Sequence, residues 1–316
     1  MNLPAEFISN IRGAFHEQGD TFLAALPESI AAASVKWNLT DVESAPTLSY
    51  NYVAFADRGE EKVVLKMGVP NRELLSEVEA LRLFNGNGAC QLLEYDEERS
   101  WMLLERLTPG EMLVTVKDDE KATRIAAEVM KKIWRPLKSL ESASLLAKPQ
   151  EQAPALQKFI PLSDWFDGLK RVRPMFNGGT GPLKESIFQR VESWVKSAFA
   201  ENHHPVLLHG DFHHYNILSS DRGWLIIDPK GVMGPAGYEV GPLLMNPWGE
   251  LLNGTNFRLM TKRRIDILHE YLGFERERIL EWGLAHAVLS AWWSIGDHIK
   301  DDYSIAFAEM IAELNV

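Results

Sequence analysis

The sequence is short of cysteine and of long apolar runs. Cys90 is the one cysteine among 316 residues, so no disulfide can form within the chain. No apolar run approaches the ~20 residues that a helix needs to span a bilayer, and Met1–Pro4 lacks the basic stretch and apolar core of a secretory signal. We therefore expect a cytoplasmic protein without a membrane span or a disulfide framework.

Positive charge is also scarce. Lys and Arg total 33 against 44 Asp and Glu, which leaves a formal charge of −11 and a pI near 5.4. Binding to a nucleic-acid backbone depends on clustered Lys and Arg, so nucleic acid is not an expected partner. The acidity is compatible with a cationic small molecule, although acidity of this size also serves solubility.

The first third of the chain predicts one helix followed by a sheet. Apolar residues at near-helical spacing over residues 4–25 indicate an N-terminal helix. A second helix is predicted over 73–84, where an apolar stripe ends at Asn85–Gly88. Short β-rich runs predict an antiparallel sheet of about five strands, over residues 35–39, 48–55, 63–66, 91–95 and 101–105.

Beyond residue 110 the pattern is mostly helical. Residues 142–157, which contain two prolines, are expected to form an exposed loop. The predicted helices cover residues 122–134, 162–172, 183–199, 257–271, 276–293 and 303–314. We therefore predict an α+β protein of two lobes, with a sheet lobe at 1–105, a hinge at 106–110 and a helical lobe at 111–316.

The most informative stretch is residues 206–228. Two short apolar strands flank a polar loop in which Asp211 and Asn216 stand five positions apart, and Asp228 ends the next strand. Transfer of the terminal phosphate of ATP needs a carboxylate for the incoming hydroxyl and oxygen ligands for Mg²⁺. We interpret Asp211 as the base, and Asn216 and Asp228 as ligands of Mg²⁺.

These residues resemble a known family. His209-Gly210-Asp211 with Asn216 is similar to the catalytic loop of aminoglycoside phosphotransferases. The run from Asp228 to Gly231 resembles one branch of them, the aminoglycoside/hydroxyurea antibiotic-resistance kinases, which include streptomycin 6-phosphotransferases. Further segments agree over residues 35–300, namely 103–107, 238–244 and 289–294. The resemblance implies a protein-kinase-like fold that uses ATP and Mg²⁺.

The resemblance also assigns nucleotide contacts. Lys66 ends the third predicted strand, where a kinase-like lobe carries the lysine that contacts the α- and β-phosphates. Glu77 is the preferred partner of Lys66, with Glu79 as the alternative. The backbone at Glu105 and Leu107 would bond adenine.

One departure from protein kinases concerns the flap over the phosphates. The predicted loop at 40–47 contains no glycine, so the glycine-rich flap is missing. Backbone amides, or the hydroxyls of Ser44, Thr47 or Ser49, are left to cover the phosphates.

The phosphoryl acceptor is less well defined by the sequence. The resemblance implies an aminoglycoside such as streptomycin, and Asp164, Asp167 and Asp297 could offer carboxylates to an amino sugar. Solvent-exposed helix faces explain these aspartates equally well. A metabolite kinase acting on an amino sugar or another small alcohol is the alternative, because fold and catalytic loop do not determine the acceptor.

Two other classes of protein remain as alternatives. A nucleotide-binding pseudokinase would bind ATP without turnover, but every catalytic group is in place. A zinc hydrolase could use the histidines near the loop, yet their spacing matches no helical zinc motif. We therefore expect His209 to brace the loop and His213 and His214 to lie near the cleft.

Overall fold

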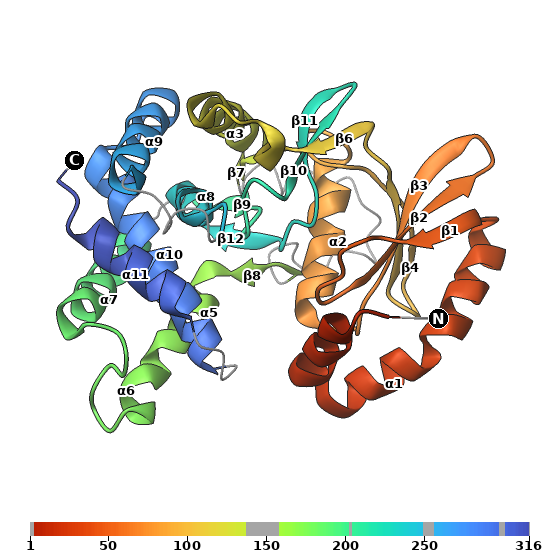
Figure 1. Cartoon of the computed structure of the whole chain (residues 1–316), viewed down its shortest axis with the longest axis horizontal. Coiled ribbons are helices and arrows are strands. Elements are labelled where there is room, and N and C mark those ends of the chain that lie inside the picture. Colours follow the sequence, from red (N-terminus) through yellow and green to blue (C-terminus); the bar gives the residue numbers. More distant parts are fainter. Residues whose placement is uncertain (1–2, 137–157, 202–203, 249–255, 297–300, 316) are drawn as a thin grey trace.

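The computed structural model describes residues 3–136, 158–201, 204–248, 256–296 and 301–315. Two lobes lie side by side along the longest axis of the molecule, with the sheet lobe on the right of Figure 1 and a larger, mainly helical lobe on the left. The predicted α+β class and the division into a small antiparallel-sheet lobe and a helical lobe are confirmed. The exposed loop predicted over 142–157 lies outside the described residues.

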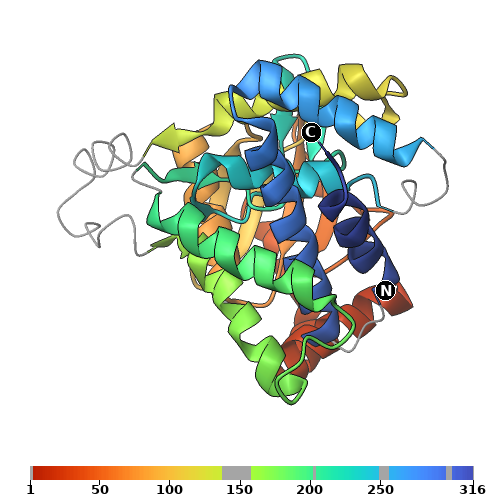
Figure 2. The same cartoon turned by 90° about the vertical axis from the view of Figure 1, so that its left-hand side faces the viewer.

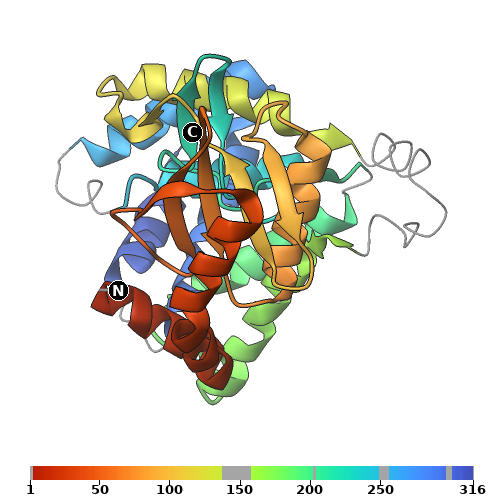
Figure 3. The same cartoon turned by 90° about the vertical axis from the view of Figure 1, so that its right-hand side faces the viewer.

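Helix α1 (Ala5–Trp37) covers the outer face of the sheet, as Figure 3 shows. Its backbone leaves helical geometry at His16, so the chain bends and follows the sheet. Phe7 and Leu26 are fully buried in a cluster with the outer face of the sheet. The helix predicted over 4–25 is present but extends further, because packing against the sheet stabilises it beyond its local pattern.

The strand predicted over 35–39 is wrong. Helix α1 continues to Trp37 and ends where Asn38 adopts left-handed backbone angles (φ 53°), with its N–H bonded to carbonyls of the last turn. Val35 is 85% exposed, so this β-branched residue is not packed in the sheet. The first strand lies instead within the predicted loop at 40–47.

The sheet of the first lobe has five antiparallel strands in the order β1-β2-β3-β5-β4. The segment predicted over 48–55 becomes a strand only from Tyr52 onward. The strands are β1 (Thr40–Ser44), β2 (Tyr52–Arg58), β3 (Glu61–Met67), β4 (Leu92–Asp96) and β5 (Trp101–Glu105). The predicted number of strands is thus confirmed.

Helix α2 (Arg72–Phe84) packs on the inner face of the sheet, between the two lobes (Figure 1). The side chain of Asn71 caps its first turn by accepting from Leu74 N at 2.9 Å. Asn85 ends it in the left-handed conformation at φ 43°. The buried face of α2 joins the hydrophobic cluster of the helical lobe, so this helix contacts both halves of the molecule.

Short strands form a framework inside the second lobe. A three-stranded sheet contains β6 (Pro109–Met112), β10 (Ile217–Ser220) and β11 (Gly223–Ile226). A four-stranded sheet contains β7 (Arg135–Pro136), β8 (Ile160–Pro161), β9 (Val206–Leu208) and β12 (Val232–Gly234). The strands predicted on either side of the Asp211 loop and before Asp228 are present as β9, β10 and β11, whereas β6, β7, β8 and β12 were not predicted. The loop between β9 and β10 carries Asp211 and Asn216, and the loop between β11 and β12 carries Asp228.

Helices surround this framework, and α10 crosses the middle of the lobe in Figure 2. The prediction of one helix over 162–172 is wrong: it is interrupted at Gly168, where a 3₁₀ turn begins and Trp292 packs closely. The described helices are α3 (Asp119–Ile133), α5 (Leu162–Asp167), α6 (Val172–Met175), α7 (Glu185–Ala200), α8 (Val240–Met245), α9 (Phe257–Leu272), α10 (Arg276–Gly296) and α11 (Asp302–Ala312). Within the described ranges, no helix is both long and apolar enough to cross a bilayer.

Candidate active site

The predicted catalytic loop, residues 209–216, follows β9. The His209 ring bonds both to this loop and to Ile227. The His209 ring is fully buried, and its Nε2–H donates to the Ile227 carbonyl at 2.9 Å. Its Nδ1 accepts from the Asp211 N–H at 3.1 Å. Burial lowers the pKa of His209 to about 4, so the neutral ring that this bonding requires is the stable form. His209 braces the loop as the sequence indicated.

Glu239 fixes the start of the same loop through the backbone. Its two carboxylate oxygens accept from the backbone N–H groups of His209 at 3.0 Å and Gly210 at 2.9 Å. The side chain is fully buried. Burial raises the pKa of Glu239 to about 8, against the lowering effect of the two N–H donors. The bend at Gly210 is therefore anchored by a side chain from the 3₁₀ turn that precedes α8.

Gly210 is required by its surroundings. Its φ of +88° lies in the left-handed region. A Cβ there would lie 2.9 Å from the Trp165 ring and from Val232. Trp165, on α5, therefore packs directly on the catalytic loop, and a larger residue at position 210 would displace it.

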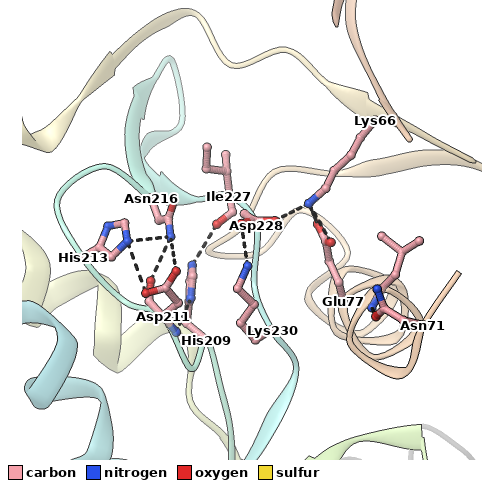
Figure 4. Close-up of polar contacts among 11 residues, drawn as sticks. Lys66, Asn71, Glu77, His209, Asp211, His213, Asn216, Ile227, Asp228 and Lys230 are labelled. Carbon is pink, nitrogen blue, oxygen red and sulfur yellow. Dashed lines mark hydrogen bonds and ion pairs between the residues drawn. The ribbon is translucent and has the colours of Figure 1, made fainter. Parts of the chain in front are cut away.

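Asp211, His213 and Asn216 converge at the mouth of the loop (Figure 4). Asn216 Nδ2 donates to the Asp211 carbonyl at 3.0 Å, and His213 Nε2 lies 3.3 Å from Asp211 Oδ1. Burial disfavours the charged carboxyl, but His213 and the Lys230 ammonium outweigh it and hold the pKa of Asp211 well below its usual range. Asp211 is thus an ionised carboxylate at the cleft.

Asp228 reaches the same cleft through the β10–β11 hairpin. Its φ of +55° is unusual for a residue with a side chain, and such strain is concentrated at functional sites. Lys66 bonds its Oδ1, and Lys230 Nζ donates to its Oδ2 at 2.9 Å. Burial opposes ionisation, but Lys230 and Lys66 together hold the pKa of Asp228 far below its usual range.

Lys66 is buried between the lobes beside Glu77. Its Nζ donates to the two carboxylate oxygens of Glu77 at 2.6 and 2.7 Å (Figure 4). Glu79, the other candidate, pairs with Arg82 and Lys158 instead. Burial disfavours the charged lysine, but Asp228 and Glu77 more than compensate, so the pKa of Lys66 is raised.

The predicted adenine contacts lie on the link between the lobes. The Glu105 N–H is already engaged, because it donates to the Gln91 carbonyl at 2.9 Å. The Glu105 side chain accepts from Gln91 N at 3.0 Å. Within the described ranges, no backbone acceptor is bonded to the Leu107 N–H. This N–H and the Glu105 carbonyl are therefore the groups left for an adenine edge.

Two of the aspartates suggested for the acceptor, Asp164 and Asp167, line a hollow of about 390 Å³ beside the loop. Asp164 bonds Arg72 at 2.9 Å, and Asp167 bonds Lys170 at 2.6 Å. Asp297 lies outside the described residues. The lining residues are Asp164, Trp165, Asp167, Gly168, Arg171, Trp292 and Trp293.

The glycine-free loop between β1 and β2 offers fewer hydroxyls than the sequence suggested. Ser44 Oγ lies 2.9 Å from the Tyr52 hydroxyl, and both belong to the strands of the sheet. Ser44 is therefore already engaged, which leaves Thr47 and Ser49 as the loop hydroxyls of that prediction.

The histidines of this region act separately. His209 bonds both the loop and Ile227, and His213 lies beside Asp211, whereas His214 is buried and neither of its ring nitrogens has a partner among the described residues. His203 lies outside the described residues, and His204 is exposed. Among the described residues, no group of three or more His, Cys, Asp or Glu is arranged to hold a metal.

Several residues of the site were not singled out from the sequence. Lys230 and Glu239 stood only within segments of the resemblance, and Ser76 and Trp165 gave no signal. Ser76 Oγ donates to the Gly231 carbonyl at 2.6 Å and so joins α2 to the segment after Asp228. For Lys230, its place two residues after Asp228 was the available signal. For Trp165, contact with Gly210 arises only from folding.

The class of protein follows from these features. A sheet lobe and a helical lobe enclose a Lys–Glu pair, an Asp/Asn loop and a second Asp, which is the arrangement of a kinase-like phosphotransferase acting on small molecules. Residues 36–297 match the aminoglycoside/hydroxyurea antibiotic resistance kinase family, and the chain belongs to this family.

Curated relatives agree over nearly the full length. The chain is 30% identical to the streptomycin 6-kinase of Streptomyces griseus, over 94% of this chain and 92% of that protein. It is 28% identical to the hydroxyurea phosphotransferase of Kitasatospora aureofaciens, over 98% of this chain and 86% of the relative. The predicted family and the predicted phosphotransferase class are confirmed.

Solved structures confirm the fold. A thermostable mutant of an aminoglycoside phosphotransferase, in ternary complex with ADP and hygromycin B, superposes with a TM-score of 0.54. Its sequence is 13% identical, and the match covers 89% of this chain and 96% of that one. The expected kinase-like fold is thus confirmed, and membership of a kinase family implies the use of ATP.

Proposed function

We propose that this enzyme transfers the γ-phosphate of ATP to a hydroxyl group of an aminoglycoside such as streptomycin, with Mg²⁺, in the cytoplasm. One observation supports the proposal: Asp211, Asn216, Asp228 and the Lys66–Glu77 pair lie in one cluster of polar side chains (Figure 4). Relatives of the chain include streptomycin 6-kinases.

Asp211 orients the acceptor and takes its proton. The acceptor oxygen attacks the γ-phosphorus, the bond from that phosphorus to the bridging oxygen breaks, and the electron pair stays on ADP. A carboxylate whose pKa lies well below the usual range is a weak base. Asp211 therefore acts mainly by holding the hydroxyl in line and receives the proton late, as the new bond forms.

Asp228 and Asn216 fit Mg²⁺, which prefers oxygen ligands. Asp228 is ionised, and Asn216 uses its Nδ2–H on the Asp211 carbonyl, so its Oδ1 is directed elsewhere. In the described part of the chain no donor is bonded to that Oδ1. Mg²⁺ would neutralise phosphate charge there. Lys66, oriented by Glu77, would hold the α- and β-phosphates.

The lobe boundary belongs to the same proposal, with a sheet lobe at 1–105, a hinge at 106–110 and a helical lobe at 111–316. Strand β5 ends at Glu105, and β6 begins at Pro109 in the next sheet. Adenine would bind at this link, through the Glu105 carbonyl and the Leu107 N–H.

The acceptor would bind in the hollow next to Trp165, which contacts the catalytic loop at Gly210. Trp165 and Trp293 stand edge to face with ring centroids 5.4 Å apart, a surface suited to sugar rings and cations. On binding, ammonium or guanidinium groups of the substrate would replace Arg72 at Asp164 and Lys170 at Asp167. Asp297 is a further candidate.

The test measures ADP release with a panel of streptomycin, other aminoglycosides, choline and amino sugars. Streptomycin should stimulate ADP release by the wild type. Asp211→Asn should lower kcat by roughly 10²–10⁴-fold while ADP affinity, measured by calorimetry, stays unchanged. Asp221→Asn, on the exposed β10–β11 turn, is the control and should behave as wild type.

Two outcomes would contradict the proposal. Stimulation by a metabolite alcohol and not by any aminoglycoside would make the protein a metabolite kinase. Tight ATP binding without turnover of any acceptor would make it a pseudokinase.

A further inference from the structure

Lys230 is a cation of the cleft to which the roles above assign no function. It follows Asp228 by two residues, and its backbone N–H donates to the His209 carbonyl at 2.7 Å. Its Cβ would lie 3.2 Å from a side chain added at Gly210. The stem of Lys230 is thus fixed against the catalytic loop at both its backbone and its Cβ.

The ammonium of Lys230 bonds one acidic centre, Asp228, and is close enough to the other, Asp211, for its charge to help lower the pKa of both carboxyls. It donates to Asp228 Oδ2 at 2.9 Å, while Lys66 holds the other oxygen of the same carboxylate. Figure 4 shows Lys230 rising toward Asp228, with His209 and then Asp211 to its left. A cation that bound Asp228 through Oδ2 would displace the ammonium, and the backbone bond of Lys230 to His209 would keep the residue next to the loop that carries Asp211.

Phosphoryl transfer needs positive charge at this place. The moving group carries negative charge on three oxygens, and enzymes neutralise it with Lys, Arg or metal ions. The loop from His209 to Asn216 contains neither Lys nor Arg. Lys66 is held at the far side of Asp228 by Glu77, at 2.6 Å. Of the two lysines bonded to Asp228, Lys230 is therefore the one next to the loop that carries Asp211.

We propose that Lys230 is a catalytic residue whose ammonium binds the γ-phosphoryl group and stabilises it during transfer. This inference rests on the proposed phosphotransfer function. Lys230 donates hydrogen bonds to the γ-phosphate oxygens while the acceptor–phosphorus bond forms and the bond to the bridging oxygen breaks. The acceptor proton goes to Asp211, and Lys230 keeps its own.

The first arm of the test needs no acceptor. Calorimetry with Mg²⁺ compares ATP and ADP binding to the wild type and to Lys230→Met. Because Lys230 contacts only the γ-group, ATP affinity should fall about 10–100-fold, and ADP affinity should change less than about 3-fold. Lys62→Met is the matched control, since Lys62 forms a similar pair with Asp57 at 2.7 Å away from the cleft.

The second arm measures turnover with saturating ATP, Mg²⁺ and acceptor. Lys230→Met should lower kcat by about 10²–10³-fold, as loss of one preorganised donor does. Lys230→Arg, which keeps the charge, should retain more activity and more preference for ATP. If the Met variant does not fold, Lys230→Gln replaces it in both arms.

If the Met variant bound ATP and ADP more weakly by the same factor, Lys230 would be only a counter-ion of Asp228, and the proposal would be overturned. Unchanged affinity for both nucleotides together with normal kcat would overturn it as well. Failure of the proposed function is separate: the wild type would then phosphorylate no acceptor, whereas the ratio of ATP to ADP affinity would still report on Lys230.

Discussion

Asp228 concentrates the electrostatics of the site in one side chain. Lys66 approaches it from β3 and Lys230 from its own segment, so each carboxylate oxygen has a separate cation. Such a carboxylate stays ionised despite burial, because the loss of hydration is offset by two positive charges. The sequence indicated Asp228 from its place at a strand end, but not the second lysine.

Buried histidines make the stability of the fold depend on pH. Burial lowers the pKa of His286 to about 4 from an ordinary value of 6.5, and Tyr238 lies 3.0 Å from its Nδ1. Between these two values the unfolded chain binds a proton that the folded chain does not. Stability should therefore be lost as the pH falls from 6.5 towards 4.

This prediction is checked by thermal unfolding at several pH values. His286→Asn keeps a polar atom near Nδ1 but does not titrate, so its stability should vary less with pH, by about one proton. His204→Asn, at an exposed position, should keep the wild-type pH dependence. Identical pH dependence in all three proteins would show that His286 does not contribute.

At the scale of elements, helix α2 and the segment after Asp228 fit against each other. Gly231 has φ +63°, and a Cβ there would lie 2.3 Å from the Ser76 carbonyl oxygen. Ser76 precedes Glu77, which bonds Lys66, so the contact fixes how β3, α2 and the segment after Asp228 lie relative to one another. No periodicity within α2 reveals this contact, because the partner lies 155 residues away.

Ser76→Ala should loosen the contact between α2 and the segment after Asp228. Loss of the buried hydrogen bond should cost about 1 kcal/mol of the free energy of unfolding. The KM for ATP should rise several-fold, because Lys66 and Asp228 are no longer held together. Ser34→Ala, which removes a similar bond within α1 at 2.8 Å, is the control for KM. A stable Ser76→Ala enzyme with the wild-type KM would show that the contact serves packing alone.

At the scale of the whole molecule, the net charge of −11 should attract the proposed aminoglycoside acceptor, which is cationic. Salt shortens the Debye length from about 10 Å at 0.1 M to about 3 Å at 1 M, so long-range attraction weakens. The KM for streptomycin should rise several-fold between about 0.05 and 0.5 M KCl, with kcat nearly constant. A KM that does not vary with salt would place recognition in short-range contacts only.

The sequence by itself determined what is local. The spacing of Asp211 and Asn216 lies within one loop, and the strand signals at 63–66 and 101–105 agree with β3 and β5. Helix α2 begins and ends at capping asparagines that can be read directly from the chain. Backbone preferences and caps act over a few residues, so such features need no knowledge of the fold.

The tertiary structure decided what depends on distant partners. Residues 35–37 have the composition of a strand, yet they finish α1, because that helix gains more by packing along the sheet than a short strand would. Trp165 lies on Gly210, and Lys230 is bonded to the His209 backbone, only because separate segments meet there. Burial and charge pairing, and hence the pKa of each site residue, arise from those meetings rather than from sequence neighbours.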